Sequence, residues 1–280
     1  MKEINVSEIS EAVKEMCIET NHFLSDDMRT VLDSAEKKEE SPLGRQILSK
    51  IKDNLKIAGE DMIPICQDTG MAVVFAEIGQ DVHISGGWIE DAINEGVSRG
   101  YTEGYLRKSV VGDPIERKNT NDNTPAVIHY SIVPGDKIKL TFAPKGFGSE
   151  NMSRVFMLKP ADGVEGIKNA VLTAVRDAGP NACPPMVVGV GIGGTFEKCA
   201  LLAKKALTRS VSERSSDPFI RDMEEELLKK INASGIGPGG LGGTTTAFAV
   251  NIETYATHIA GLPVAVNICC HVNRHAVRIL

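Results

Sequence analysis

The sequence contains no uncharged run of about 18 apolar residues, which a membrane-spanning helix would require. Its first residues, MKEINVSEISEAVKEM, also lack the apolar core of a signal peptide. No basic patch with interleaved aromatic residues occurs, and the net charge is −6. These absences argue against a membrane or nucleic acid as a partner, and we expect a cytoplasmic protein.

The composition is that of an ordinary globular protein. The 280 residues are 42% hydrophobic and 24% charged, close to the average of soluble domains. A chain of this length can bury a core without disulfide bonds, so the six cysteines are expected to be thiols or metal ligands. Without a clean linker or an internal repeat, we expect one domain over 1–280. Its fold class is expected to be α+β, with mixed sheets surrounded by helices.

Local signals predict a helical part over 1–60. Apolar residues at helical spacing favour a helix over 7–24, and Ser25 is a candidate N-cap for a second helix. Ser41 followed by Pro42 is typical of an N-cap and the first position of a third helix. Later helices are expected over 87–106, 163–178, 195–208 and 217–233.

Short apolar runs predict the strands. One buried strand is expected over 71–79, and others in the segments MVVGVG, TAFAVNIE and LPVAVNI. The runs 126–133 and 136–142 flank Pro134-Gly135-Asp136, a turn signal that predicts a β-hairpin between them.

Glycines form two notable patterns. Gly189, Gly191 and Gly194 satisfy the G-x-G-x-x-G fingerprint of dinucleotide-binding proteins, between an apolar strand and a helix. A polar loop and another helix follow where a second strand should end in an acidic residue, so we favour glycines that permit a tight turn and close packing. A second run, 235–243, has six glycines in nine residues, which indicates a close backbone approach.

None of the six cysteines lies in a C-x-x-C motif, which argues against zinc ribbons and two-cluster ferredoxins. Cys66, Cys183 and Cys270 occupy loops or strand ends, where thiolates can bind metal. Spacing alone leaves two interpretations open, a three-cysteine metal site and three unrelated buried thiols.

Two of the other three cysteines are expected not to bind metal. Cys17 and Cys199 lie within predicted helices, where a cysteine is usually small apolar filler. Cys269 alternates with Cys270 along a strand, so only one of the two thiols should face a common site.

Six motifs carry a family resemblance. They are CQDTG (66–70), KGFGSEN (145–151), NACPP (181–185), GVGIGGT (189–195), the glycine run 235–243, and VAVNICCHVNR (264–274). With these motifs, the sequence resembles the alpha subunit of class I (iron–sulfur) fumarate hydratases and of the related L-tartrate dehydratases. The resemblance extends from about residue 40 to the end of the chain.

The resemblance implies a 4Fe–4S cluster as cofactor, with Cys66, Cys183 and Cys270 as its ligands. Three protein ligands leave one iron open to act as a Lewis acid. Substrate contacts are implied for further residues, namely Gln67, Asp68, Arg107, Gly146 and Gly148. His258, twelve residues before Cys270, is implied to pair with Asp68, and the two are the expected catalytic residues.

The implied reaction is reversible hydration of fumarate to L-malate, a step of the tricarboxylic acid cycle. In the family the base and several carboxylate clamps belong to a C-terminal domain, so a separate beta subunit is expected to supply them. An alpha–alpha dimer within an alpha2beta2 heterotetramer is expected. Dehydration of L(+)-tartrate is the alternative reaction. From other classes, an iron–sulfur sensor or electron carrier and a nicotinamide dehydrogenase are the alternatives.

Two departures from the family pattern stand out. The family often has three consecutive glycines where this sequence has Gly146-Phe147-Gly148. Many members have Cys-Trp-x-x-Arg-Arg where this sequence reads CHVNRH from Cys270. We expect His271 and His275 to be surface or interface residues, because no helical periodicity surrounds them.

Overall fold

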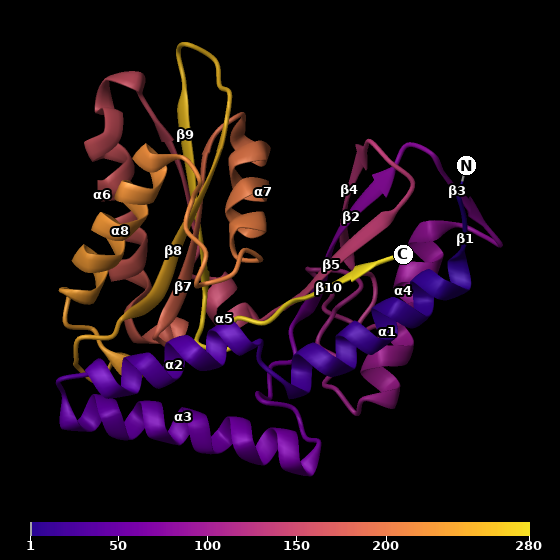
Figure 1. Ribbon diagram of the computed structural model, residues 1–280, viewed down its shortest axis with the longest axis horizontal. Helices are drawn as coiled ribbons and strands as arrows, with labels where there is room; N and C mark the ends of the chain where they lie inside the picture. The colour runs from indigo at the N-terminus through magenta and orange to yellow at the C-terminus, as the bar shows by residue number, and fades with distance from the viewer. Residues whose placement is uncertain (1) are drawn as a thin grey trace. The chain divides into compact units, whose positions relative to one another are not determined.

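The computed structural model describes residues 2–280 and has an α+β architecture (Figure 1), which confirms the expected fold class. The chain forms two compact units. Unit 1 contains the residues up to Leu24, Leu55–Phe147 and Arg274–Leu280, and unit 2 contains Ser25–Asn54 and Gly148–Asn273. The single domain over 1–280 stays a prediction, because a high density of contacts does not show that either unit folds alone.

Unit 1 packs helices against a four-stranded sheet. Its elements are β1 (Lys2–Asn5), α1 (Val6–His22), β2 (Met71–Gly79), β3 (Val82–Ser85), α4 (Ile89–Glu103), β4 (Val127–Val133), β5 (Ile138–Lys145) and β10 (Ala276–Ile279). The sheet has the order β10-β5-β2-β4, and β1 pairs with β3 beside it. Helices α1 and α4 pack on each other, and their apolar faces form one core with the inner side of β2 and β5.

The predicted hairpin between 126–133 and 136–142 is wrong. Strands β4 and β5 do form there, but β2 lies between them. It pairs parallel with β4 and antiparallel with β5. Strand β2 is buried along most of its length and can bury its backbone only by pairing on both sides. The turn at Gly135 therefore joins strands that are not neighbours.

Unit 2 has helices on both faces of a second sheet. Its elements are α2 (Asp26–Lys38), β6 (Arg154–Leu158), α6 (Gly163–Ala178), β7 (Met186–Gly193), α7 (Phe196–Ala206), α8 (Pro218–Asn232), β8 (Ala247–Tyr255) and β9 (Leu262–Cys269), with the short turns η1 (Pro160–Asp162), η2 (Gly179–Ala182) and η3 (Pro238–Gly240). The strand order is β6-β9-β7-β8. Helices α6 and α8 cover one face and α7 covers the other (Figure 1). Two further helices, α3 (Pro42–Asp61) and α5 (Phe147–Glu150), have residues in both units.

Glycines set how closely α7 packs on β7. A Cβ atom on Gly191 would lie 2.0 Å from the Cys199 carbonyl oxygen, and one on Gly189 would lie 2.2 Å from the Ala203 carbonyl oxygen. Gly194 has a φ of +69° in the turn that leads into α7. The fingerprint glycines therefore serve a tight turn and close packing, as the sequence favoured.

Helix starts follow the sequence signals. The Ser41 hydroxyl oxygen accepts a hydrogen bond from the Gly44 N–H (3.1 Å), as expected of an N-cap before Pro42. Ser25 does precede α2, but its hydroxyl group donates to Asp27 and does not cap the helix backbone. Within residues 2–280, every helix is too short or too polar to cross a membrane.

Candidate functional site

The CQDTG loop (residues 66–70) connects α3 to β2 in unit 1, and buried side chains hold its backbone. The Tyr101 hydroxyl group, on α4, donates to the carbonyl oxygens of Thr69 (2.6 Å) and Gly70 (3.1 Å). The Asn123 amide donates to the same Gly70 oxygen (3.1 Å), and its own oxygen accepts the Ser109 N–H (2.8 Å). These bonds fix the loop from its buried side, since an unpaired carbonyl there would be costly.

Asp68 lies at the centre of the loop and is half-buried. One carboxylate oxygen accepts the Gly70 N–H (2.9 Å), and the other accepts the Phe147 N–H (2.8 Å). Two backbone donors thus orient the carboxylate, and the second joins the CQDTG loop to the KGFGSEN segment. Unit 1 therefore brings the CQDTG loop together with residues 145–147, the first part of the KGFGSEN motif.

The two glycines of the KGFGSEN segment differ in the space available for a side chain. A Cβ atom on Gly146 would lie 3.1 Å from an Asp68 carboxylate oxygen, so a side chain there would press on Asp68. A Cβ atom on Gly148 would meet nothing within 4 Å. Close packing against Asp68 therefore explains the glycine at 146. The surroundings of position 148 do not require a glycine there.

Arg107 and Gln67 are two predicted substrate residues with exposed side chains. The backbone carbonyl oxygen of Arg107 accepts a hydrogen bond from the Thr69 hydroxyl group (2.8 Å), which places this arginine beside the CQDTG loop. Unit 1 thus gathers an arginine, an amide and a carboxylate within one small region.

Cys66 is half-buried, and its sulfur accepts a hydrogen bond from the Asp68 N–H (3.4 Å). Backbone N–H groups that point at sulfur stabilise thiolates and tune iron–sulfur clusters. In contrast, Cys17 has no exposed surface, and burial raises the pKa of its thiol well above its usual value. Burial also raises the pKa of Cys199, whose sulfur donates to the Phe196 carbonyl oxygen. Both were expected to be filler, and both are buried.

Cys183 and Cys270 lie in unit 2, where His271 connects their segments. Cys183 is exposed and ends η2 with a φ of +51°, a left-handed conformation that is uncommon outside glycine. Its carbonyl oxygen accepts hydrogen bonds from His271 twice, from the backbone N–H (3.3 Å) and from ring Nδ1 (2.9 Å). Cys270 is half-buried after β9, whereas Cys269 is buried as the last residue of that strand.

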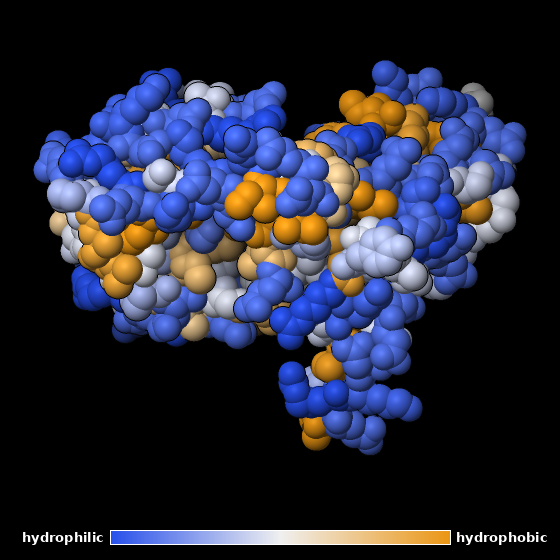
Figure 2. Space-filling model, turned by 90° about the horizontal axis from the view of Figure 1, so that it is seen from below, coloured by the Kyte–Doolittle hydropathy of each residue, from blue (hydrophilic) through white to orange (hydrophobic). Residues whose placement is uncertain are grey.

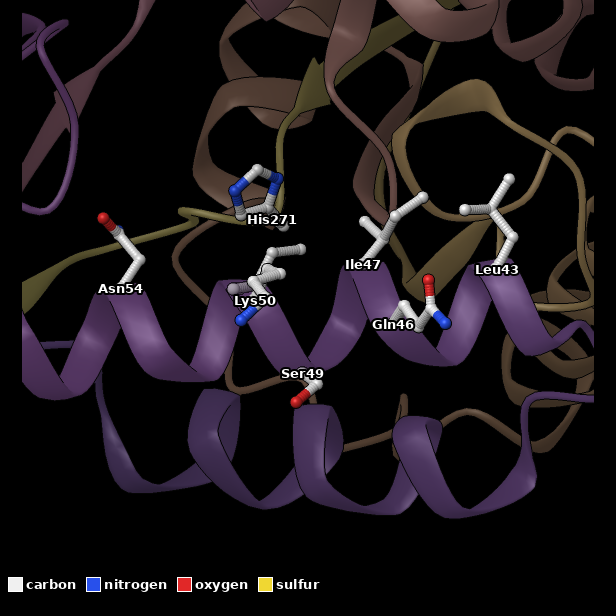
Figure 3. A pocket seen from close by; sticks show the side chains of 8 residues that line it. Leu43, Gln46, Ile47, Ser49, Lys50, Asn54 and His271 are labelled. Atoms are coloured by element: carbon white, nitrogen blue, oxygen red, sulfur yellow. The ribbon is translucent and has the colours of Figure 1, made fainter.

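No local signal in the sequence indicates a role for His271, for which the expectation is a position at a surface or an interface. It is half-buried and joins the segments of two cysteines that are 87 positions apart, so tertiary structure alone reveals its role. It also lines a pocket of about 520 Å³ along α3, opposite Ile47, Lys50 and Asn54 (Figure 3). Apolar residues interrupt the hydrophilic surface on the face that carries α3 (Figure 2).

The glycine run 235–243 supports the same turn. The Gly239 N–H donates to the Pro184 carbonyl oxygen (2.9 Å). A Cβ atom on Gly240, which has a φ of +73°, would lie 2.3 Å from Pro180. The close approach that the sequence indicated is therefore to the NACPP turn, which carries Cys183.

His258 lies in the connection between β8 and β9 and is exposed. Its Nδ1 accepts the Ala260 N–H (3.1 Å), so the proton of the neutral ring is on Nε2. Asp68 belongs to unit 1 and His258 to unit 2, and their pairing stays a prediction.

Within residues 2–280, the structure gathers no group of three His, Cys, Asp or Glu side chains that would hold a metal ion. One of the predicted thiols lies in unit 1 and two lie in unit 2. The donors themselves fit an iron–sulfur cluster, because all three thiols are on loops or strand ends, are at least partly exposed, and one already accepts a backbone N–H.

Comparison with known proteins identifies the family. The family model described as fumarate hydratase (Fumerase) matches residues 10–278. The chain belongs to this family. A protein of Methanocaldococcus jannaschii, provisionally named L(+)-tartrate dehydratase subunit alpha, is 44% identical over 276 residues, which are 96% of each chain. The L(+)-tartrate dehydratase subunit alpha of Escherichia coli K12 is 30% identical over 276 residues, which are 98% of this chain and 91% of its own.

Membership in the fumarate hydratase family confirms the relationship that the motifs indicated, to the alpha subunits of class I fumarate hydratases and L-tartrate dehydratases. The family consists of hydro-lyases, so the coarse class of reaction agrees with the sequence-based expectation.

Proposed function

We propose that this chain is the alpha subunit of an iron–sulfur hydro-lyase that catalyses reversible hydration of fumarate to L-malate. The observation that carries the proposal is the arrangement around Asp68, whose carboxylate is oriented by two backbone N–H groups between the CQDTG and KGFGSEN motifs. Family membership supports the class of reaction.

Cys66, Cys183 and Cys270 would hold a 4Fe–4S cluster, which supplies a Lewis acid for hydroxyl and carboxylate oxygens when bound. Asp68 would donate the proton to the departing oxygen, and His258 would exchange that proton with solvent. The exposed side chains of Gln67 and Arg107 would bind the substrate carboxylates. Gly146 keeps space free beside Asp68, and Gly148 would be a further contact of the substrate.

A separate beta subunit would supply the base that removes the proton next to the second carboxylate. The relatives are named as alpha subunits, which supports such a partner. We propose an alpha2beta2 assembly for the complete enzyme. The alpha chain alone should then show no turnover.

Dehydration of L(+)-tartrate is the second candidate, favoured by the names of the relatives. Both candidates remove water from a 2-hydroxydicarboxylate, and part of the pocket would lie on the beta subunit. The deciding experiment is anaerobic reconstitution of alpha with beta, assayed on L-malate, L-tartrate and mesaconate. A higher kcat/KM for L-tartrate than for L-malate would replace the first candidate with the second, and no activity on any of the three would reject both.

The cluster ligands can be tested separately. Cys183→Ser should remove the visible absorption of the reconstituted cluster and the activity with beta, whereas Cys199→Ser should keep both, because Cys199 is buried filler in α7. A Cys183→Ser protein with full iron and sulfide content would show that the ligand assignment is wrong. An electron carrier would have four protein ligands, and its spectrum would not change on addition of fumarate.

A further inference from the structure

Arg274 is a buried arginine whose hydrogen-bonding capacity is mostly unused. Its residue surface is 4% exposed. Nη2 donates to the backbone carbonyl oxygen of Asp68 (2.6 Å), while Nε and Nη1 have no hydrogen-bond partner. Within residues 2–280, Arg274 forms no ion pair.

A buried guanidinium group without an anion is unfavourable, because its charge loses the solvation of water. Arg209, in the loop after α7, is less buried, with a side chain that is 15% exposed, and it follows the usual rule. Arg209 pairs with two carboxylates, Glu224 and Glu253. The carboxylate of Asp68, in contrast, is held by backbone N–H groups, and Arg274 contacts only the Asp68 main chain. Arg274 thus lacks the charged partner that burial normally requires.

Arg274 lies beside the CQDTG loop. Its single hydrogen bond ends on the CQDTG loop, at the residue between Cys66 and the tyrosine-anchored carbonyls of Thr69 and Gly70. In sequence it lies four positions after Cys270. A cation here is therefore next to the loop that carries the proposed acid and one proposed cluster ligand.

We propose that Arg274 is an anion-binding residue of this site, which holds the Asp68 backbone with Nη2 and receives a negatively charged group on Nε and Nη1. Guanidinium N–H groups bind carboxylate oxygens strongly and also donate to anionic sulfur. The anion is either a carboxylate of the substrate or the cluster with its thiolates. The identity of the anion, though not the need for one, rests on the proposed function.

Two variants and a control test this proposal in the anaerobically reconstituted alpha–beta complex. Arg274→Gln removes the charge, and Arg274→Lys keeps the charge but not the planar fork. The control is Arg278→Gln, four residues on in β10, whose side chain pairs with Glu19 at the surface. For each protein, iron and sulfide content, the Kd of fumarate from the change in the visible spectrum, and kcat and KM are measured.

If the anion is the substrate carboxylate, Arg274→Gln should keep its iron content and raise the fumarate Kd by about tenfold or more, the loss of one charged hydrogen bond. If the anion is the cluster, the variant should retain less than about half the iron and sulfide of the wild type, and its loaded fraction should bind fumarate normally. For Arg274→Lys, the affected quantity should lie between the values of the wild type and of Arg274→Gln. Arg278→Gln should match the wild type in iron content and in fumarate Kd.

Wild-type iron content together with wild-type Kd in Arg274→Gln would overturn the proposal. Circular dichroism of the apo chains shows whether the variant is folded, and if it is not, the same criteria apply to Arg274→Lys. A wild-type chain that takes up no cluster would reject the proposed function instead. The anion site would then stand only if fumarate raises the Tm of the wild type and not that of the Arg274 variants.

Discussion

Tyr101 has no exposed surface, and its hydroxyl group serves the backbone of the CQDTG loop. Burial raises the pKa of this phenol, so it remains a neutral donor. Tyr101→Phe should lower the free energy of unfolding by about 1–3 kcal/mol, because the Thr69 and Gly70 carbonyls lose a donor in a buried position. Urea unfolding of the apo chain measures this change.

The matched control is Tyr105→Phe, since Tyr105 lies just beyond the same helix and is 90% exposed. It should change the free energy of unfolding by less than about 0.5 kcal/mol. Equal stability of the two variants would show that the hydroxyl group of Tyr101 does not anchor the loop.

Glu39, between α2 and α3, is a buried carboxylate with 1% exposure. Burial alone would raise its pKa, but the backbone N–H groups of Thr244 and Ser41 and other donors outweigh burial, and the pKa is lowered. A lowered folded-state pKa means that the stabilisation is present above the unfolded-state pKa and is lost as the pH falls through the folded value.

Glu39→Gln should therefore lower the free energy of unfolding by about 1–3 kcal/mol at neutral pH, and this difference should shrink below about pH 4.5. Unfolding curves at several pH values measure it, with the exposed neighbour Glu40→Gln as the control. A difference that stays constant down to pH 3 would contradict the ionised state of Glu39.

The role of a single residue was predictable where the residue lies in a short motif with a recognisable function. Asp68 and Gly146 were identified from their motifs, and the structure places them side by side. Tyr101 and His271 were not recognised as part of the site, because each acts on a backbone carbonyl distant in the sequence. Nothing in the local pattern of α4 distinguishes Tyr101 from an ordinary core residue.

At the scale of elements, the contact between β7 and α7 depends on glycine. Gly191→Ala should lower the free energy of unfolding by about 1–3 kcal/mol, since its Cβ atom would lie 2.0 Å from a backbone oxygen of α7 and the helix must move. Thermal unfolding followed by circular dichroism measures the effect.

Gly261→Ala is the control in the same unit, because a Cβ atom there has no neighbour closer than 3.9 Å. A Gly191→Ala protein as stable as this control would mean that α7 does not pack as closely as described. A nicotinamide-binding role for these glycines would instead predict NAD binding by the wild-type chain, and we expect none.

Elements whose boundaries depend on local chemistry were predicted well. The strand over 71–79 and the helix over 163–178 have the expected bounds, since apolar runs and caps act over a few residues. The pairing of β4 and β5 was predicted wrongly, because a turn signal at Gly135 does not show which strand will lie between its flanks. Which strands pair with the buried β2 depends on all strands of the sheet and not on one turn.

At the scale of the whole molecule, each unit has its own apolar core. The core of unit 1 joins α1 and α4 to its sheet, and the core of unit 2 joins α6 and α8 to the other sheet. None of the proposed ligands Cys66, Cys183 and Cys270 belongs to these two clusters. The cores therefore do not depend on a cofactor for their packing.

Removal of the cluster by a chelator or by air should abolish activity of the complex while the chain stays folded. The far-UV circular dichroism of the apo chain should match that of the reconstituted chain within about a tenth of the helix signal, and its unfolding should remain cooperative. Loss of most of the helix signal on removal would show that the cluster organises the fold, as metals do in small metal-dependent domains.

By itself the sequence determined the longer helices and strands and which motifs carry the chemistry, because these depend on periodicity, caps and residue types within short windows. The short strands β1, β3, β6 and β10 were not predicted, since each has only four or five residues. Tertiary structure decided which strands are neighbours, that His271 connects the segments of Cys183 and Cys270, and that Arg274 is buried against Asp68. Pairing and burial of this kind depend on residues far apart in the chain, which meet only when the apolar faces of many elements are buried together.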